Sequence, residues 1–96
     1  MLNGKQKRFL RAKANHIKPI FQVGKSGVSD NMLKQIGEAL EKRELIKVHI
    51  LQNNMEEKTE VANQLEAGTE AEIVQIIGNQ IVLYRESEEN KQIKLP

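Results

Sequence analysis

Cysteine is absent from this 96-residue chain, so the protein has no disulfide, no thiol nucleophile and no thiolate metal site. No apolar run approaches the roughly 20 residues of a membrane span, and the charged start from Lys5 onward is unlike a secretory signal. Two prolines and 96 residues suit one domain with one modest core. We therefore expect a soluble cytoplasmic protein, without a cofactor or a metal.

Negative charge is missing from the first 29 residues, and the first acid of the chain is Asp30. The basic residues of this segment are Lys5, Lys7, Arg8, Arg11, Lys13, Lys18 and Lys25. Because the whole chain carries +2 and this segment +7, the remainder carries −5. Such one-sided charge indicates a polyanionic partner, although an ordinary solvated basic helix remains the alternative.

The stretch Gly24-Lys25-Ser26-Gly27 predicts a loop that faces phosphate. Its glycines permit a sharp turn and close backbone approach, and its amides precede a helix N-terminus, which favours anions. Lys25 adds a mobile charge and Ser26 adds a hydroxyl. The alternative is a plain strand-to-helix turn with a solvated Lys25. A nucleotide-hydrolysing P-loop is excluded, because its first glycine is replaced here by Pro19.

Helical spacing of apolar residues predicts two helices in the first half of the chain. The first begins after Asn3, with Gln6 completing a capping box, and ends near Asn15. The second begins after Ser29, a favourable N-cap, and continues to about Arg43. The first helix buries Phe9 and Leu10 and exposes a basic stripe made by Lys7, Arg8 and Arg11.

A third helix is predicted over about residues 55–67. Asn54 and Glu57 form a second capping pair before it, and Gly68 provides a stop after it. Its expected inner face consists of Met55, Ala62 and Leu65.

Alternating apolar residues predict strands at 19–23, 45–51, 71–77 and 80–85. Gly78-Asn79 suits a tight turn, so the last two strands form an antiparallel hairpin, and strands joined by helices are expected to pair in parallel. Lys47 and His49 lie on the strand face opposite the main apolar row, either open or under a helix.

The order α-β-α-β-α-β-β predicts a single α/β domain over 1–96, with helices packed on a four-stranded mixed sheet. Its core covers about residues 2–86. The tail, 87–96, is polar and is expected to be loosely held until Ile93 and Leu95.

Several short blocks carry a family resemblance in the correct order along the chain. They are 5–11, 18–20, 22–27, 44–48, 74–78 and 81–85. Together they resemble the bacterial YhbY-type proteins, which are stand-alone CRM (chloroplast RNA splicing and ribosome maturation) domains. The resemblance covers about residues 2–85.

The resemblance implies a fold similar to the C-terminal domain of translation initiation factor three. It also implies RNA binding through the glycine loop and nearby basic surface, and association with rRNA of the large ribosomal subunit precursor. The residues that it marks are Gly24, Lys25, Ser26 and Gly27 in the loop, Lys7, Arg8, Arg11 and Lys18 on the basic surface, and Lys47 and Arg85 on strands. The acid-rich stretch 86–89 lies outside the shared blocks.

Other functions are weighed against this one. His16 and His49 lie in different elements, and no acid near His16 in sequence could orient it as a base, so we expect no enzyme. An adaptor for ribosomal proteins, or a general RNA chaperone acting on small RNAs, remains the alternative. With two Phe, one Tyr and no Trp, the monomeric protein is expected to contact phosphates and RNA shape rather than stack bases.

Overall fold

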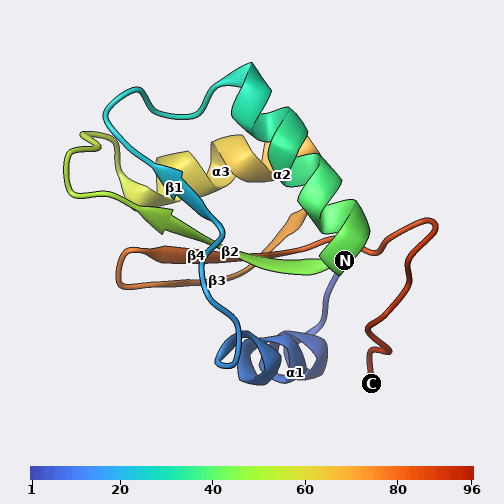
Figure 1. Cartoon of the computed structure of the whole chain (residues 1–96). Helices are drawn as coiled ribbons and strands as arrows, with labels where there is room; N and C mark the ends of the chain where they lie inside the picture. Colours follow the sequence, from blue (N-terminus) through green and yellow to red (C-terminus); the bar gives the residue numbers. More distant parts are fainter.

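Helices and strands alternate along the chain in the order that the sequence predicts. The computed structural model describes residues 1–96 and contains three helices around a four-stranded sheet (Figure 1). The elements are α1 (Gly4–Ala14), β1 (Phe21–Val23), α2 (Asp30–Arg43), β2 (Leu45–Ile50), α3 (Lys58–Thr69), β3 (Glu72–Ile77) and β4 (Gln80–Tyr84). None of the helices has the length and hydrophobicity needed to span a membrane.

The sheet is mixed, with the strand order β1-β2-β4-β3. β1 and β2 are parallel and are connected by α2, and β3 and β4 form the predicted antiparallel hairpin, with Gly78 at a φ of 57° in its turn. The expectation that β2 and β3 would pair in parallel is wrong. β4 lies between them and pairs antiparallel with both, so the connection through α3 skips one strand.

Two apolar cores lie on opposite faces of the sheet. One joins Ile46 and Val48 of β2 to α2 and α3, and the other joins Leu45 and Tyr84 to α1. Figure 1 shows α2 and α3 above the sheet and α1 alone below it. Alternation of side chains along a strand produces this division, because neighbouring residues point to opposite faces.

The predicted starts of α1 and α2 are confirmed. The Asn3 side chain accepts a hydrogen bond from the Gln6 amide at 2.8 Å, and the Gln6 side chain accepts one from the Asn3 amide at 3.1 Å. The Ser29 hydroxyl accepts from the Met32 amide at 3.1 Å. Each contact satisfies a donor that a helix start leaves unpaired.

The predicted start of α3 is wrong. Asn54 does not cap the helix, because its side-chain amide donates to the Gly24 carbonyl at 2.9 Å and its oxygen accepts from the Glu56 amide. The helix begins at Lys58, with Glu57 as an N-cap that forms no side-chain hydrogen bond. Met55 therefore lies outside the helix and is 92% exposed.

Gly68 also has a different role from the predicted stop. α3 continues through Thr69 and turns at Glu70, which has a φ of 61°. A Cβ atom at Gly68 would lie 2.5 Å from Cδ1 of Leu33 in α2. The missing side chain thus allows α3 to pack closely on α2, a tertiary requirement that a helix-end pattern does not contain.

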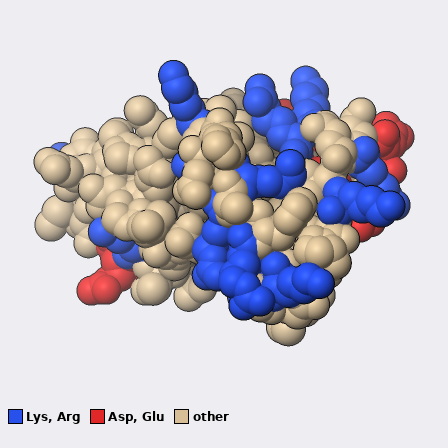
Figure 2. Space-filling model, turned by 90° about the horizontal axis from the view of Figure 1, so that it is seen from below, with Lys and Arg blue, Asp and Glu red and all other residues tan.

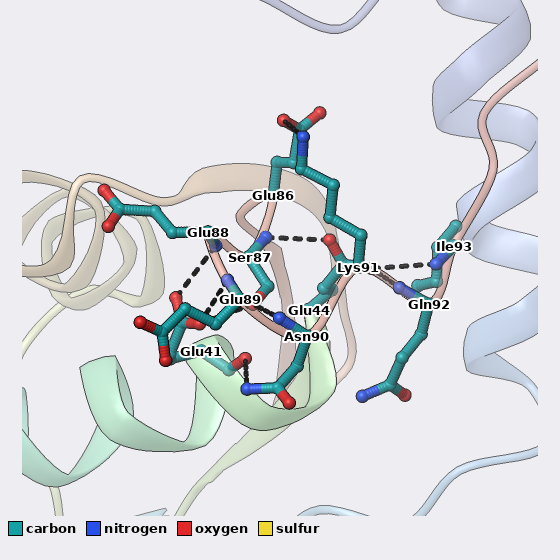
Figure 3. A network of polar contacts seen from close by, with 10 residues as sticks. All are labelled: Glu41, Glu44, Glu86, Ser87, Glu88, Glu89, Asn90, Lys91, Gln92 and Ile93. Atoms are coloured by element: carbon teal, nitrogen blue, oxygen red, sulfur yellow. Dashed lines mark hydrogen bonds and ion pairs between the residues drawn. The ribbon is translucent and has the colours of Figure 1, made fainter.

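The C-terminal tail is tethered rather than loosely held (Figure 3). Its amides donate to two carboxylates at the end of α2: Ser87 to Glu44 at 2.7 Å, and Glu88 and Glu89 to Glu41 at 3.1 and 3.0 Å. Further along, Gln92 and Ile93 donate to Glu44 at 2.7 and 2.8 Å. The tail can then place Ile93 and Leu95 against the core beside α1.

Tail docking should depend on pH. The Ser87 hydroxyl and the Glu88 and Glu89 amides lower the pKa of Glu41 from 4.5 to about 2. Since folding lowers this pKa, the carboxylate stabilises the docked tail above pH 4.5, and that contribution is lost as the pH falls toward 2. We expect the Glu88 and Glu89 amide resonances to move toward free-chain positions across this window.

Glu41→Gln is the matching variant, because it removes the charge without changing the side-chain size. It should weaken tail docking at neutral pH, whereas Glu38→Gln, at an exposed site on the same helix, should not. Amide spectra of Glu41→Gln that match those of the unmodified protein throughout the titration would show that Glu41 does not hold the tail.

Candidate nucleic-acid interface

The basic stripe of α1 lies on the exposed side of that helix. Leu10 and Ala14 are buried against the sheet, while Arg8 is exposed and Arg11 is half-buried. Figure 2 views the side of the molecule on which α1 lies and shows Lys and Arg side chains gathered over its middle, whereas Asp and Glu appear only toward its edges. This side, which we call the α1 face, therefore presents mainly positive charge to solvent.

A groove of about 620 Å³ separates α1 from the β3–β4 hairpin. We call it the hairpin groove. Its positive side chains are Arg8, Arg11 and Lys47, and no acidic residue lines it. Gln75 and Gln80 contribute neutral hydrogen-bonding groups from β3 and β4. The groove thus combines cations from two elements that are far apart in sequence.

A second cavity, of about 630 Å³, lies beside the connection between α1 and β1. We call it the linker pocket. Lys13, His16, Lys18 and Arg43 line it together with Gln92, and again no acidic residue takes part. Its apolar residues are Ile17, Ile20, Leu45, Ile46 and Ile93.

Lys47 lies between these two sites. The sequence left open whether its side chain is exposed or covered by a helix. Its side chain is half-buried on the α1 face, where Nζ donates to the Ile17 carbonyl at 3.0 Å. The Lys47 carbonyl in turn accepts from the Ile20 amide at 3.1 Å. Lys47 thus fixes the linker and keeps its remaining N–H donors beside the hairpin groove. His49, two residues further along β2, belongs to the same strand face and is also half-buried.

The glycine loop is a turn with unpaired donors. The Gly24 carbonyl accepts from the Gly27 amide at 3.0 Å, and Gly27 adopts a φ of 73°, which favours glycine. The amides of Lys25 and Ser26 donate no hydrogen bond within the protein, and both side chains are exposed. These donors precede α2, as an anion site requires.

Two features set this loop apart from the α1 face. A Cβ at Gly27 would lie 3.0 Å from a carboxylate oxygen of Glu56, so a negative group sits beside the loop. No loop residue lines the hairpin groove or the linker pocket. In Figure 1 the loop lies at the far end of β1 from α1, next to the start of α2.

The structure does not bring Lys7 and Arg85 to either groove. Lys7 lines a separate cavity at the β3 edge, together with the acids Glu66, Glu70 and Glu72. Arg85 lies on the opposite side of the sheet, where its guanidinium donates to the carbonyls of Thr69 and Gly37, each at 2.8 Å. Its donors thus connect the end of α3 to α2.

Lys13 and Arg43 are candidate contacts that the sequence patterns do not mark as RNA-binding residues. Lys13 is exposed and its Nζ lies 5.7 Å from the centroid of the Phe9 ring, so this ammonium caps the apolar side of α1. Arg43 is the last residue of α2 and reaches the linker pocket from another part of the chain. In the sequence, only the position of Arg43 at the end of a predicted helix could indicate a role in binding, and this is a weak signal because basic residues are common at helix C-termini.

Known proteins resemble this chain along its whole length. The protein "Probable RNA-binding protein YqeI" of Bacillus subtilis is 68% identical over 96 residues, covering all of both chains. A Haemophilus influenzae protein named "RNA-binding protein" is 42% identical over 95 residues, covering 99% of this chain and 95% of that one. A solution structure from Staphylococcus aureus is 60% identical, covers all of both chains and superimposes with a TM-score of 0.83.

A family model also matches this chain, over residues 2–85, and it describes the CRS1/YhbY (CRM) domain. The match covers all three helices and all four strands, and it agrees with the resemblance expected from the sequence blocks. The chain belongs to the CRS1/YhbY (CRM) domain family.

Proposed function

We propose that this protein binds structured RNA, with the α1 face as its main contact surface. One observation carries the proposal: two adjoining sites beside α1 are lined by six Lys or Arg side chains and by no acid. The names of the Bacillus subtilis and Haemophilus influenzae relatives support the same class of ligand. The role is one of binding, and we propose no catalytic step.

Phosphate contacts would supply most of the affinity. Lysine and arginine side chains neutralise RNA phosphates and release counterions, which makes binding strongly dependent on salt. The α1 face offers no exposed Phe, Tyr or Trp ring to stack a base, since Tyr84 is buried and Phe9 is half-buried; the exposed imidazole of His16 is the one small ring beside it. We therefore expect recognition of RNA shape and backbone, with weak preference for base sequence.

The RNA that we propose is the rRNA of the large ribosomal subunit precursor, and the process is assembly of that subunit in the cytoplasm. This finer statement rests on the resemblance to stand-alone CRM domains. A test is to sediment cell lysate through sucrose gradients at low and high salt and to probe each fraction for this protein. Comigration with large-subunit precursors, lost at high salt, is the expected result.

The same gradient distinguishes the alternative partners. A protein that stays at the top of the gradient even at low salt would contradict the ribosomal part of the proposal. It would favour a small RNA, or an adaptor role toward a ribosomal protein. Ribonuclease treatment of these top fractions before size-exclusion chromatography separates the two cases, because a complex with RNA becomes smaller and a complex with a protein keeps its size.

We further propose that Gly24-Lys25-Ser26-Gly27 adds a separate phosphate contact outside the α1 face. The free amides of Lys25 and Ser26 and the exposed ammonium of Lys25 support this role. Lys25→Ala should weaken RNA binding by about threefold to tenfold and reduce the slope of log affinity against log salt by about 0.7 to 0.9. Filter binding over a series of salt concentrations measures both quantities.

The thermal unfolding of Lys25→Ala should match that of the unmodified protein, because this exposed side chain makes no hydrogen bond or ion pair in the structure. An unchanged salt slope would show that the loop is a simple turn and does not contact phosphate. Because the Glu56 carboxylate lies beside Gly27, Glu56→Gln is the complementary variant and should strengthen binding through the loop.

A further inference from the structure

We propose that the linker pocket holds one unpaired nucleotide of the bound RNA. This inference rests on the proposed RNA binding and adds a site for a single base to it. Its starting point is the chemistry of the lining, which differs from that of the hairpin groove. Half of the ten residues that line the pocket are hydrophobic, and the polar half carries only positive or neutral groups.

The apolar residues form a surface that suits a base without reading its edge. Ile17 and Ile20 come from the linker and Ile93 from the tail, while Leu45 and Ile46 at the start of β2 also line the pocket but are buried. Burial of apolar area favours a flat base that has left its stack, and aliphatic side chains contribute no hydrogen bonds that would select one base. The volume, about 630 Å³, falls within the ordinary range for small-ligand pockets.

The charged residues suit the phosphates on either side of that base. Lys13 and Lys18 approach from the end of α1 and the linker, and Arg43 approaches from the end of α2. None of these three forms an ion pair within the protein, so their charge is available to a ligand. A ligand with an apolar flat part between two anionic groups complements this arrangement, and an RNA nucleotide has that form.

Both walls of the pocket are fixed before any ligand binds. Lys47 holds the linker through the Ile17 carbonyl at 3.0 Å and the Ile20 amide at 3.1 Å. On the other side, the buried Glu44 carboxylate accepts from the amides of Gln92 and Ile93 at 2.7 and 2.8 Å. A preformed pocket loses less conformational freedom on binding, which favours affinity.

Lys47 also connects the pocket to the rest of the interface. Its side chain lines the hairpin groove, while its ammonium is bonded to a residue that lines the linker pocket. An RNA stem along the hairpin groove could therefore extend one bulged nucleotide across the linker. Bulges and loops are the places where bases leave an RNA stack at least cost.

The test compares two RNA hairpins that differ by one unpaired adenosine in the stem. The unmodified protein should bind the bulged hairpin about tenfold more tightly, which corresponds to about 1.4 kcal/mol. Ile20→Asn, which makes the pocket wall polar without changing charge, should reduce this preference to about twofold or less, because affinity for the bulged hairpin falls more than affinity for the paired one.

Ile77→Asn is the matched control. Ile77 lines the hairpin groove and is 56% exposed, compared with 42% for Ile20 in the linker pocket, so both substitutions should leave the fold intact. Ile77→Asn should retain the preference for the bulge. A second pair, Arg43→Gln and Lys42→Gln, tests the charge at the end of α2, and only Arg43→Gln should reduce the preference.

The outcomes separate this inference from the proposed function. Equal affinity for the two hairpins, or a preference that survives both Ile20→Asn and Arg43→Gln, would overturn the pocket assignment and leave RNA binding in place. Failure to bind either hairpin would overturn both. Free adenosine monophosphate provides a further test. If the protein binds it tightly, if Ile20→Asn abolishes that binding and if the bulged hairpin is not preferred, the pocket serves a free nucleotide and the assignment to RNA is wrong.

Discussion

Glu44→Gln is expected to destabilise the protein by about 3 kcal/mol, because charge-assisted hydrogen bonds to a buried carboxylate cannot be replaced by a neutral amide. The Glu44 carboxylate is fully buried and accepts hydrogen bonds from the amides of Ser87, Gln92 and Ile93. A glutamine has one acceptor oxygen and turns an NH₂ group toward at least one of these donors. Donors of the tail would then face a donor instead of an acceptor.

The pKa of Glu44 supports its role as a charged anchor. Burial raises this pKa, but the three tail amides more than offset that effect, so the pKa lies below 4.5. The carboxylate is therefore charged at neutral pH despite its burial. Its backbone also adopts a φ of 65°, an uncommon value for a residue other than glycine.

Thermal unfolding followed by circular dichroism checks this expectation. For a domain of this size, a loss of about 3 kcal/mol lowers the Tm by roughly 12 to 24 °C. Glu38→Gln, at an exposed site on α2, should leave the Tm within about 2 °C of the original. A Glu44→Gln protein with an unchanged Tm and unchanged tail amide resonances would show that the tail is not anchored by this carboxylate.

The second large effect concerns RNA affinity. The double variant Arg8→Gln/Arg11→Gln should lower affinity for a structured rRNA fragment by about 10-fold to 100-fold at low salt, because it would remove two proposed phosphate contacts from the hairpin groove. The salt slope should fall by about 1.4 to 1.8 for the same reason. Neither arginine forms an ion pair within the protein, so stability should change little.

A double variant of equal charge provides the control for non-specific electrostatics. Lys34→Gln/Lys42→Gln removes the same charge from exposed positions of α2, which packs on the opposite face of the sheet from α1. It should reduce affinity by no more than about threefold, as a distant charge is screened within a Debye length of about 8 to 10 Å. Equal losses for the two double variants would contradict a localised interface.

Local sequence patterns predicted those parts of the fold that depend on local contacts. The caps at Asn3 and Ser29 lie within three residues of their partners, and the hairpin turn at Gly78-Asn79 joins adjacent strands. The same patterns predicted wrongly, or did not predict, the contacts between residues that are far apart in the sequence. Asn54 resembled a helix cap, but the carbonyl that it contacts belongs to Gly24, thirty residues away.

The tail and the interface show the same limit of sequence patterns. Residues 86–96 are polar, yet their amides find acceptors about 45 residues earlier, at Glu41 and Glu44. The basic first segment predicted one surface of Lys7, Arg8, Arg11 and Lys18, and the structure places all of these except Lys7 along the two sites beside α1. The segment could not show that the fold adds Arg43 from α2. Nor could it show that the guanidinium of Arg85 donates its hydrogen bonds to the carbonyls of Thr69 and Gly37 within the protein.

Titration of ¹⁵N-labelled protein with a structured large-subunit rRNA fragment tests the central claim most directly, because it identifies the contacted residues without mutation. The proposed interface predicts shift changes at Arg8, Arg11 and Lys47 and in the linker, 15–20, with little change at Lys34 on α2. These changes should diminish as salt is raised. Shifts confined to α2 and α3, or no shifts at low salt, would contradict an RNA-binding surface centred on α1.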